Sequence, residues 1–536
     1  MKYKVCILAA GKGSRVSYSK IINKALLPVG DETALTRIIN KFPEDIEFVI
    51  PVGYNAQQIK DFLAIAHPQR LITYVDVDNW DEPGSGPGYS LLSCKPHLDC
   101  PFIFTSCDTI VLEAIPEPSR NWIGVAKVLD SKDYCIAEVV RGRVSRFYDK
   151  IDTATLVKIC EDFNTILDHA FIGMAAVHDH KIFWKALEGN KTQLIKNELQ
   201  VSNGLNKLIE KNLFAEKFTW FDTGNEISYE YTNRYFNKNR VLLKDNEFIY
   251  FEDDKVIKYF ANEQIVTNRL KRAKKLKGFV PDVKIHKKNY FAYNYVEGKM
   301  LSEITDRSVF KKLLQFFDDS LWKEVKIDAK AKKDFSDICM KFYKEKTESR
   351  VQDFFQKTGM KDRSEQINGV VVPSTQELFA RVDWNNLCEG VPVLFHGDFQ
   401  PENIIVADDG FVLLDWRQDF GGCTDYGDLY YDFAKLYHAC IISGEMIRKN
   451  EFNIDIKADE VTFNFLVKRN LVDLKKTFIR FINEKGYDLR RVRLLTSLIY
   501  LNIAPFHHDP YNKLVYFLGK NMLNDILEEK DGVQND

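Results

Sequence analysis

The sequence predicts two domains of different class, an α/β domain followed by an α+β domain that has a small and a large lobe. Before about residue 238, short apolar strand-like runs alternate with helix-like segments, which is typical of an α/β layer. A polar, charged segment at residues 237–246 (NKNRVLLKDN) then marks a boundary. After it, short strands come first and helices come later, as in α+β folds.

The first half, residues 1–238, opens with a strand at residues 4–10 that ends in a glycine turn. Further strand-like runs lie at residues 48–52, 71–75, 102–105 and 122–129, with helix-like segments at 34–41 and 56–66. Because strands that are separated by helices usually pair in parallel, we expect a mixed but mainly parallel sheet.

The second half, residues 239–536, begins with two short strands at residues 248–251 and 255–260, which we expect to form a hairpin. A basic helix follows at about 263–277, residues 301–385 are mostly helical in pattern, and strands return at 393–395, 404–406 and 411–414. Beyond residue 425 the pattern is helical to the end, with fraying expected at 527–536. This order predicts a small lobe at about 245–298 and a large lobe at about 299–526.

Composition places the chain among globular proteins and excludes several functional classes. The 536 residues are 45% hydrophobic and 28% charged, and 77 acidic against 75 basic residues leave no bulk basic field to hold nucleic acid or an anionic membrane. The apolar stretch at residues 494–508 is too short and too polar to span a bilayer, and the apolar run at residues 5–10 is shorter than a signal-peptide core. Ten cysteines without a CxxC pair indicate a reducing compartment, so we expect a cytoplasmic protein.

A glycine loop follows the first strand, in the sequence ILAAGKGSR at residues 7–15. Glycines there let backbone N–H groups approach an anion, although the loop matches neither the dinucleotide-binding pattern nor the P-loop and alone fits a structural turn equally well. After Arg15 at the end of this loop, a second cationic residue, Lys24, follows in NKALLPV at residues 23–29. Together, LAAGKGSR and NKALLPV resemble the signature of the nucleotidyltransferases that activate sugar phosphates or phosphocholine, which implies a Rossmann-like fold.

Other segments agree with this resemblance in chain order, namely VGYN at 52–55, PGSGP at 83–87, FIG at 171–173 and WFDTG at 220–224. The resemblance implies catalytic roles for Arg15 and Lys24, which would hold the phosphates, and metal binding by Asp108 and Asp222. It implies that the nucleotide is bound by Leu8, Ala10, Gly11, Gly13, Ser14, Gly84, Ser85 and Gly86, and the acceptor by Lys150 and Gly173.

The chemistry of nucleotidyl transfer requires these residue types. A phosphate oxygen of the acceptor attacks the α-phosphorus of a nucleoside triphosphate, so catalysis consists of alignment and of charge neutralisation by cations and by Mg²⁺ or Mn²⁺. Without the surrounding motifs, Asp108 and Asp222 would read as turn residues at strand ends. Asn203 stands where many sugar-nucleotide members carry Asp, and the domain is short. Both departures favour the phosphocholine cytidylyltransferase branch, and hence CTP over UTP.

A second motif, HGDFQPEN at residues 396–403, has the form HxDxxxxN and is followed by LLDW at 413–416. In phosphoryl transfer this pattern lets Asp398 orient the acceptor hydroxyl while Asn403 and Asp415 supply oxygens for Mg²⁺. With GDLYYDFA at 427–434, the motif resembles the aminoglycoside phosphotransferase and choline kinase family and implies a two-lobed, kinase-like fold that uses ATP.

The small lobe carries weaker signals for the same site. Lys258 lies where this family places its phosphate-binding lysine, although an exposed strand lysine is the alternative, and Glu263 is the nearest candidate for its partner. Tyr295 lies in YNYVEG (293–298), which resembles the hinge that contacts adenine. Trp322, Trp384 and Trp416 would form a cage for a quaternary ammonium, or else lie separately in the core.

The two halves together predict a bifunctional enzyme. We expect ATP-dependent phosphorylation of a small polar alcohol or amino alcohol, then CTP-dependent nucleotidyl transfer to the phosphomonoester, giving a CDP-activated precursor for surface glycan modification. One alternative is a sugar kinase joined to a sugar-phosphate nucleotidyltransferase that makes an NDP-sugar. Another is that one half is a non-catalytic regulatory module. The identity of the acceptor and the oligomeric state, a homo-oligomer included, stay open.

Overall fold

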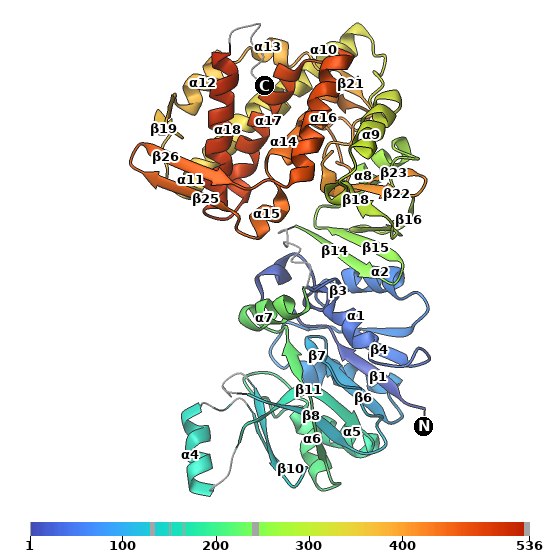
Figure 1. Ribbon diagram of the computed structural model, residues 1–536. Helices are drawn as coiled ribbons and strands as arrows, with labels where there is room; N and C mark the ends of the chain where they lie inside the picture. Colours follow the sequence, from blue (N-terminus) through green and yellow to red (C-terminus); the bar gives the residue numbers. More distant parts are fainter. Residues whose placement is uncertain are drawn as a thin grey trace. The chain divides into compact units, whose positions relative to one another are not determined.

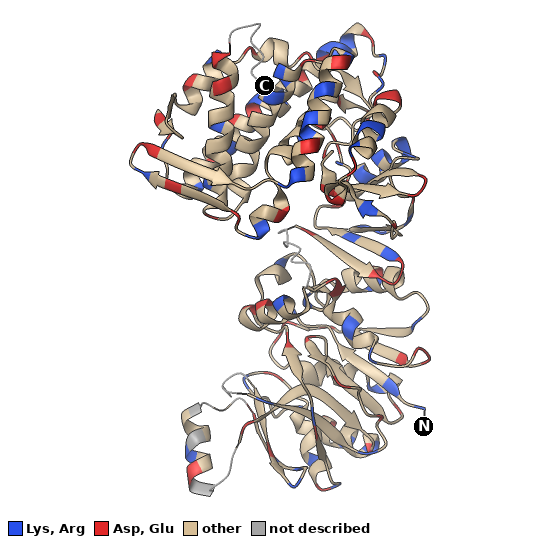
Figure 2. Cartoon of the chain, in the orientation of Figure 1, with Lys and Arg blue, Asp and Glu red and all other residues tan. Residues whose placement is uncertain are grey.

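The computed structural model describes residues 2–128, 134–149, 151, 153–163, 167–237 and 246–529. The chain forms two compact units. The first comprises Met1–Glu263 with Lys284–Tyr293, and the second comprises Gln264–Val283 with Asn294–Asp536 (Figure 1). Lys and Arg are interspersed with Asp and Glu along both units, in keeping with the net charge of −2 (Figure 2). Among the described residues, no helix is long and apolar enough to cross a membrane.

A nine-stranded sheet forms the centre of the first unit, with the strand order β5-β4-β1-β6-β11-β8-β12-β10-β9. Its strands are β1 (Lys4–Leu8), β4 (Glu47–Val52), β5 (Leu71–Asp76), β6 (Phe102–Ser106), β8 (Trp122–Lys127), β9 (Cys135–Val140), β10 (Arg143–Asp149), β11 (His169–Val177) and β12 (Phe214–Lys217). The first four strands in this order pair in parallel, as does β8 with β12.

The remaining neighbours in the sheet pair antiparallel, so the sheet is mixed, as expected, but it is not mainly parallel. The tight turn between β9 and β10 gives part of the reason, because Arg141 and Gly142 both have positive φ angles (50° and 77°). A two-residue turn of this kind joins adjacent antiparallel strands, whereas the expectation rested on the helix-like segments that lie between several of the strands.

Helices cover both faces of the sheet. The helices of the first unit are α1 (Ala34–Ile39), α2 (Ala56–Ala66), α3 (Pro87–Ser93), α4 (Thr153–Phe163), α5 (His180–Gly189), α6 (Ser202–Ile209) and α7 (Glu226–Phe236). Along β1, Val5 and Ile7 belong to the apolar core that α1 and α2 share, and Cys6 and Leu8 to the core under α3, α5 and α6. Side chains alternate across a strand, so a strand that is apolar throughout is buried on both faces.

The first unit also contains the hairpin that follows the transferase-like segment. The four-stranded sheet β14-β15-β17-β16 consists of β14 (Glu247–Glu252), β15 (Lys255–Phe260), β17 (Tyr290–Asn294) and β16 (Val283–His286). The Tyr250 and Tyr259 hydroxyls donate to the carbonyl oxygens of Leu26 and Ile21, each at 2.8 Å. Because these tyrosines and their neighbours are buried against the first unit, the expected division at 238/239 does not coincide with the compact units. Residues 238–245 themselves lie outside the described part of the chain.

The second unit is mostly helical. Its helices are α8 (Glu263–Lys275), α9 (Arg307–Asp319), α10 (Ala329–Met340), the π-helical η5 (Lys341–Glu345), α11 (Lys346–Thr358), α12 (Thr375–Arg381), α13 (Trp384–Leu387), α14 (Leu429–Ile441), α15 (Gly444–Arg448), α16 (Arg469–Lys485), α17 (Leu489–Ile503), the 3₁₀ turn η7 (Ala504–Phe506) and α18 (Tyr511–Glu528). The hairpin of β22 (Ile404–Ala407) and β23 (Gly410–Leu413) confirms the strands expected there.

A second hairpin, β25 (Phe452–Lys457) with β26 (Glu460–Phe465), contradicts the expectation that the chain is helical throughout beyond residue 425. The alternation of apolar residues in FNIDIK and EVTFNF has the period of two that is typical of strands, and the expectation overlooked it. β26 pairs with β19 (Glu365–Ile367), which also pairs with β20 (Val370–Val372).

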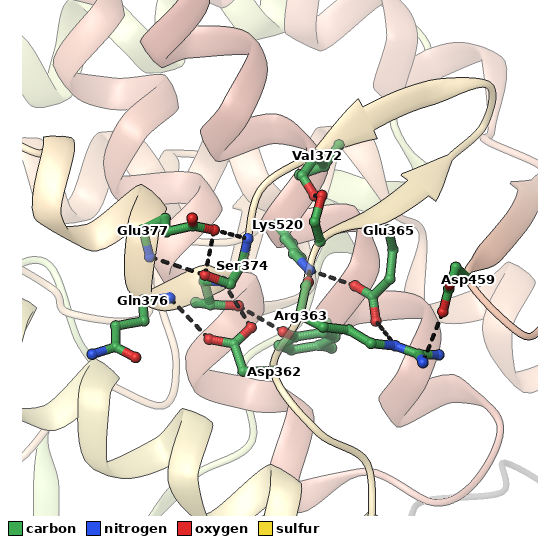
Figure 3. A network of polar contacts seen from close by, with 12 residues as sticks. Asp362, Arg363, Glu365, Val372, Ser374, Gln376, Glu377, Asp459 and Lys520 are labelled. Atoms are coloured by element: carbon green, nitrogen blue, oxygen red, sulfur yellow. Dashed lines mark hydrogen bonds and ion pairs between the residues drawn. The ribbon is translucent and has the colours of Figure 1, made fainter.

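A buried ion pair attaches this small sheet to α18 (Figure 3). Lys520 is 0% exposed, and its ammonium contacts the Glu365 carboxylate and donates to the Arg363 carbonyl oxygen at 2.6 Å. Arg363 in turn pairs with Asp459 at 2.7 Å, next to β26. A buried cation that is fully paired fixes the position of the groups around it, so this network holds β19 against α18.

Candidate active sites

In the first unit, the glycine loop and Lys24 pack directly against each other. Gly13 has a φ angle of 66°, and a Cβ atom built on it would lie 2.7 Å from Cδ of Lys24. Only glycine therefore leaves room for the lysine stem, which explains why the loop and the NKALLPV segment occur together. The Lys24 ammonium lies 2.6 Å from Oδ2 of Asp108. Burial opposes the charged form of Lys24, but Asp108 outweighs it, so the pKa of Lys24 is raised.

The two predicted metal ligands lie close together. Asp108 follows β6, and Asp222 ends β13 (Trp220–Asp222), which pairs with β7 (Thr109–Val111) so that Thr109 and Asp222 face each other. A Cβ atom built on Gly224 would lie 2.9 Å from Oδ1 of Asp222, 3.0 Å from Oδ2 of Asp108 and 3.7 Å from Nη2 of Arg15. The tertiary structure thus gathers Arg15, both carboxylates and the Lys24 ammonium around one point.

The charges at this point suit a divalent cation. Burial and the neighbouring Asp108 carboxylate raise the pKa of Asp222, because the two negative charges repel each other. Burial also opposes the charge of Asp108, but Lys24 outweighs it and the pKa of Asp108 is lowered. No group of three or more acidic, His or Cys side chains suited to a metal occurs in the described part of the chain. Two carboxylates nevertheless fit Mg²⁺, which is usually bound by one or two carboxylates together with substrate phosphates.

Several groups around Asp108 and Asp222 were missed by the sequence analysis. The Ser106 hydroxyl donates to the Asp108 carboxylate, and the Tyr134 hydroxyl and the Asn225 amide donate to Oδ2 of Asp222, each at 3.3 Å. Tyr134 is far from both motifs in sequence, so no local pattern signals it. Asn225 directly follows WFDTG and caps α7, so its signal was present in the sequence.

The remaining transferase predictions lie near this centre or along the loops beside it. Gly173 (φ 78°) lies at a register shift of β11, and a Cβ atom on it would be 3.2 Å from Cβ of Ser106. The segment Gly84, Ser85 and Gly86 pairs with residues 197–199 through backbone hydrogen bonds. The other predicted nucleotide-binding residues form the end of β1 and the loop after it: Leu8, Ala10, Gly11 and Ser14. Lys150 lies outside the described residues.

Asn203 has a local structural role. Its amide nitrogen donates to the carbonyl oxygens of Gln193 at 2.8 Å and Asn190 at 3.3 Å, and the residue is only 7% exposed. An aspartate carboxylate could not donate these bonds. Local hydrogen bonding therefore accounts for Asn at this position, and the residue gives no independent support for CTP.

In the second unit, each carboxylate oxygen of Asp398 has a partner. Nδ2 of Asn403 donates to Oδ2 of Asp398 at 2.9 Å, and the Lys435 ammonium lies 2.8 Å from Oδ1. The register of β22 with β23 pairs Ile404 with Leu413, so Asn403 and Asp415 lie just beyond the same end of the hairpin. Asp415 has a φ angle of 57° and lies 3.9 Å from the Arg269 guanidinium. The structure thus brings Asp398, Asn403 and Asp415 together at one end of the β22–β23 hairpin.

The loop of the HGDFQPEN motif, residues 396–403, is the predicted catalytic loop, and it is held by a carboxylate from α14. Asp432 accepts from the backbone N–H groups of His396 and Gly397, each at 2.7 Å, and burial raises its pKa to about 6. Burial also lowers the pKa of His396 to about 4, so its imidazole is neutral and donates through Nε2 to the Leu414 carbonyl oxygen. The role of the GDLYYDFA motif in holding this loop is revealed only by the packing of α14.

The small-lobe predictions have mixed outcomes. Lys258 is 3% exposed on β15, which excludes the alternative of an exposed strand lysine. Glu263 pairs with Lys288 at 3.2 Å on the surface of the first unit. Tyr295 belongs to the second unit and is 57% exposed.

The tryptophan cage is not formed. The indole N–H groups of Trp322, Trp384 and Trp416 donate to three different partners, Asp432, the Phe379 carbonyl oxygen and the Arg269 carbonyl oxygen. Each ring is buried separately in the core of the second unit.

Comparison with known proteins confirms both family resemblances. Residues 5–115 match the family described as MobA-like NTP transferase domain, and residues 350–459 match the phosphotransferase enzyme family. The chain is 33% identical over 106 residues to the bifunctional protein GlmU of Methanococcus aeolicus, covering 19% of this chain and 24% of that protein. It is 30% identical over 166 residues to the bifunctional IPC transferase and DIPP synthase of Archaeoglobus fulgidus, covering 29% of this chain and 32% of that protein.

Thus the chain spans about a quarter to a third of the length of these curated relatives. Among solved structures, the CTP:phosphocholine cytidylyltransferase from Streptococcus pneumoniae is 15% identical with a TM-score of 0.36, covering 44% of this chain and 99% of that one. UDP-glucose pyrophosphorylase from Acinetobacter baumanii is 16% identical with a TM-score of 0.35, covering 44% and 93%. At this similarity neither structure bears on the substrate.

Proposed function

The chain joins a MobA-like NTP transferase domain to a domain of the phosphotransferase enzyme family, and from this premise we propose that it is a bifunctional kinase and nucleotidyltransferase. The kinase half phosphorylates a small polar alcohol with ATP. The transferase half then joins the phosphomonoester to CMP from CTP, giving a CDP-activated group for transfer onto a surface glycan. The observation that carries the proposal is the pair of separate acidic centres, Asp108 with Asp222 in one unit and Asp398 with Asp415 in the other.

In the kinase reaction, Asp398 orients the acceptor hydroxyl and accepts its proton as the oxygen bonds to the γ-phosphorus of ATP. ADP leaves with the electron pair of the broken bond. The side-chain amide of Asn403 holds Oδ2 of Asp398, which aligns the carboxylate. Asn403 and Asp415, and separately Asp108 and Asp222, would hold Mg²⁺ or Mn²⁺, whose charge offsets that of the nucleotide phosphates.

In the transferase reaction, an oxygen of the phosphomonoester attacks the α-phosphorus of CTP and pyrophosphate leaves. Arg15 and Lys24 neutralise the triphosphate, with backbone N–H groups of the Gly11–Arg15 loop beside them. No covalent enzyme intermediate is needed, so positioning and electrostatic stabilisation supply the rate enhancement.

The second candidate is a sugar kinase joined to a nucleotidyltransferase that makes an NDP-sugar from UTP. With Asn203 explained by local hydrogen bonds, the preference for CTP rests on the short transferase domain and the family resemblance. A non-catalytic half is disfavoured, because both acidic centres retain their residues. CTP and UTP at equal concentration, compared by pyrophosphate release, distinguish the first two candidates.

The test uses the full chain with ATP, CTP and a pool of alcohols, and identifies products by mass spectrometry. Asp108→Ala should accumulate the phosphomonoester, whereas Asp398→Asn should form no product unless the phosphomonoester is supplied. Asp45→Ala and Asp409→Asn are matched controls, because both carboxylates are exposed in loops. Loss of both activities in a folded Asp398→Asn protein would contradict two independent sites.

A further inference from the structure

A cavity of about 240 Å³ lies within the second unit, between η5, α11, α14, α17 and η7. Four cationic side chains line it: Lys346, Arg350, Arg417 and Lys435. The described residues that line the cavity include no acidic side chain. A volume of this size suits a small molecule, since cavities for drug-sized ligands begin at roughly 300 Å³.

The cavity adjoins the catalytic loop on the side of Asp398. Lys435 lines the cavity and pairs with Oδ1 of Asp398 at 2.8 Å. Arg417 comes two residues after Asp415, and its stem packs on the catalytic loop, because a Cβ atom built on Gly397 would lie 2.5 Å from Cβ of Arg417. A molecule in the cavity would therefore lie beside the group that orients the acceptor hydroxyl.

Only two of the four cationic side chains that line the cavity form ion pairs with carboxylates of the described residues. Lys435 is paired with Asp398, and Arg350 lies 3.8 Å from Asp353. Within the described ranges, Lys346 and Arg417 form no ion pair with a carboxylate. Burial first, and then the neighbouring cations Arg417, Arg350 and Lys435, lower the pKa of Lys346 to about 7, against a smaller opposing effect of Asp419. The lowered pKa reflects crowding of positive charge, and an anion bound in the cavity would relieve that crowding and favour the charged form of Lys346.

Aromatic rings in the cavity already face cations of the protein. The Lys346 ammonium lies 4.0 Å from the centroid of the Phe342 ring, and the Arg417 guanidinium lies 5.0 Å from it. Arg350 lies 4.2 Å from the centroid of Phe506. A quaternary or primary ammonium ligand would have to displace these cations and would meet their repulsion.

We propose that the acceptor of the kinase half is a small anionic alcohol, one that carries a carboxylate or a phosphate besides the hydroxyl that is phosphorylated. Lys346, Arg350 and Arg417 bind the anionic group, since arginine matches carboxylate and phosphate oxygens in geometry and charge. The hydroxyl oxygen bonds to the γ-phosphorus of ATP, its proton passes to Asp398, and ADP leaves. This assignment rests on the proposed kinase function and replaces the expectation of an amino alcohol.

The first experiment compares four three-carbon alcohols that differ in charge, using the full chain with ATP and measuring ADP and the phosphorylated product. Glycerate and glycerol 3-phosphate are the anionic arms, and they distinguish a carboxylate from a phosphate. Glycerol is the neutral arm and 2-amino-1,3-propanediol the cationic one. We expect kcat/KM for at least one of the two anionic alcohols to exceed kcat/KM for glycerol and for 2-amino-1,3-propanediol by tenfold or more.

A second experiment tests the cavity directly. Lys346→Met and Arg350→Gln should each raise KM for the anionic alcohol about tenfold or more, with KM for ATP unchanged, since each removes a charge-assisted bond. Lys344→Met is the matched control, because Lys344 lies nearby on η5 and does not line this cavity. Thermal stabilisation by glycerol 3-phosphate should likewise weaken in Lys346→Met and persist in Lys344→Met, which provides a readout independent of turnover.

The outcomes separate this inference from the proposed function. Preferred turnover of the neutral or cationic arm would overturn the anionic assignment and keep the kinase. A matching rise of KM for ATP in Lys346→Met and Arg350→Gln would assign the cations to ATP and also overturn it. ADP formation with none of the four alcohols would overturn the kinase function, and the acceptor assignment with it.

Discussion

Gly13→Ala should lower the rate of nucleotidyl transfer about 10²-fold while leaving the kinase intact, because the added methyl group would displace Lys24. Gly13 has a φ angle of 66°, and the new Cβ atom would lie 2.7 Å from Cδ of Lys24. Non-bonded carbons normally stay about 3.5–4.0 Å apart, so the lysine stem must move by about 1 Å. The Lys24 ammonium, which lies 2.6 Å from Oδ2 of Asp108, would move with it.

Two contributions of known size make up the expected effect. The left-handed conformation of an alanine costs roughly 1–2 kcal/mol of folding free energy. A displacement of about 1 Å at a positioning group can lower the catalytic rate about 10²-fold. The free energy of unfolding should therefore fall by roughly 1–2 kcal/mol, and the transferase rate should fall about 10²-fold.

The assay measures pyrophosphate release from a supplied phosphomonoester and thermal unfolding of the same protein. Gly142→Ala is the matched control, because Gly142 has a φ angle of 77° and no neighbouring atom within 4 Å of the point where the added methyl group would lie. It should lose similar stability and keep its transferase activity. Equal activity in Gly13→Ala and Gly142→Ala would refute the packing argument.

Three further predictions follow from buried charged groups. Asp432→Asn should lower kinase activity at least tenfold, with transfer unchanged, because an amide cannot accept both N–H groups of the catalytic loop as the carboxylate does; activity equal to wild type would exclude the positioning role. Burial raises the pKa of Glu252 from 4.5 to about 8, so the stability contributed by its protonated form is complete below pH 4.5 and is lost as the pH rises through 8. Glu252→Gln should therefore raise the free energy of unfolding above pH 8, by up to about 5 kcal/mol, and flatten its pH dependence in urea titrations; parallel curves for the two proteins would contradict this. Lys520→Met should destabilise the second unit by about 3–5 kcal/mol, because the buried Glu365 carboxylate loses its buried partner and keeps only the half-exposed Arg363 guanidinium, 3.5 Å away, and Lys520→Met with Glu365→Leu should recover most of the loss in thermal melts.

The short motifs carried most of the chemistry that could be predicted from the sequence. Asp398 and Asn403 lie five residues apart, and the hairpin that follows is short enough to bring Asp415 beside them. The spacing alone therefore predicts that the three side chains lie at one end of this hairpin. The loop with Lys24 is likewise local. Asp108 and Asp222 are distant in sequence, and only the family resemblance placed them together. Their proximity around Gly224 agrees with it.

Errors in the predicted fold arose where a local pattern has two tertiary solutions. The alternation of strands and helices does not fix strand direction, and the tight turn at residues 141–142 made that part of the sheet antiparallel. The hairpin of β14 and β15 was expected in the kinase half, yet its tyrosines are buried against residues of the first unit. Asn203 was interpreted as a specificity signal, whereas its amide serves nearby carbonyl groups.

By itself, the sequence determined the two kinds of chemistry and their order along the chain, because phosphate loops and acidic metal ligands depend on spacings of a few residues. Only the tertiary structure decided which distant side chains surround those groups. Lys346, Arg417 and Lys435 belong to different segments, and each taken alone looks like an ordinary surface cation in the sequence. Packing of α11, α14 and α17 places them around one cavity beside Asp398. Helical periodicity predicts that a helix has a buried face but does not specify which other helix covers it, so the charge of this cavity emerges only when the helices pack.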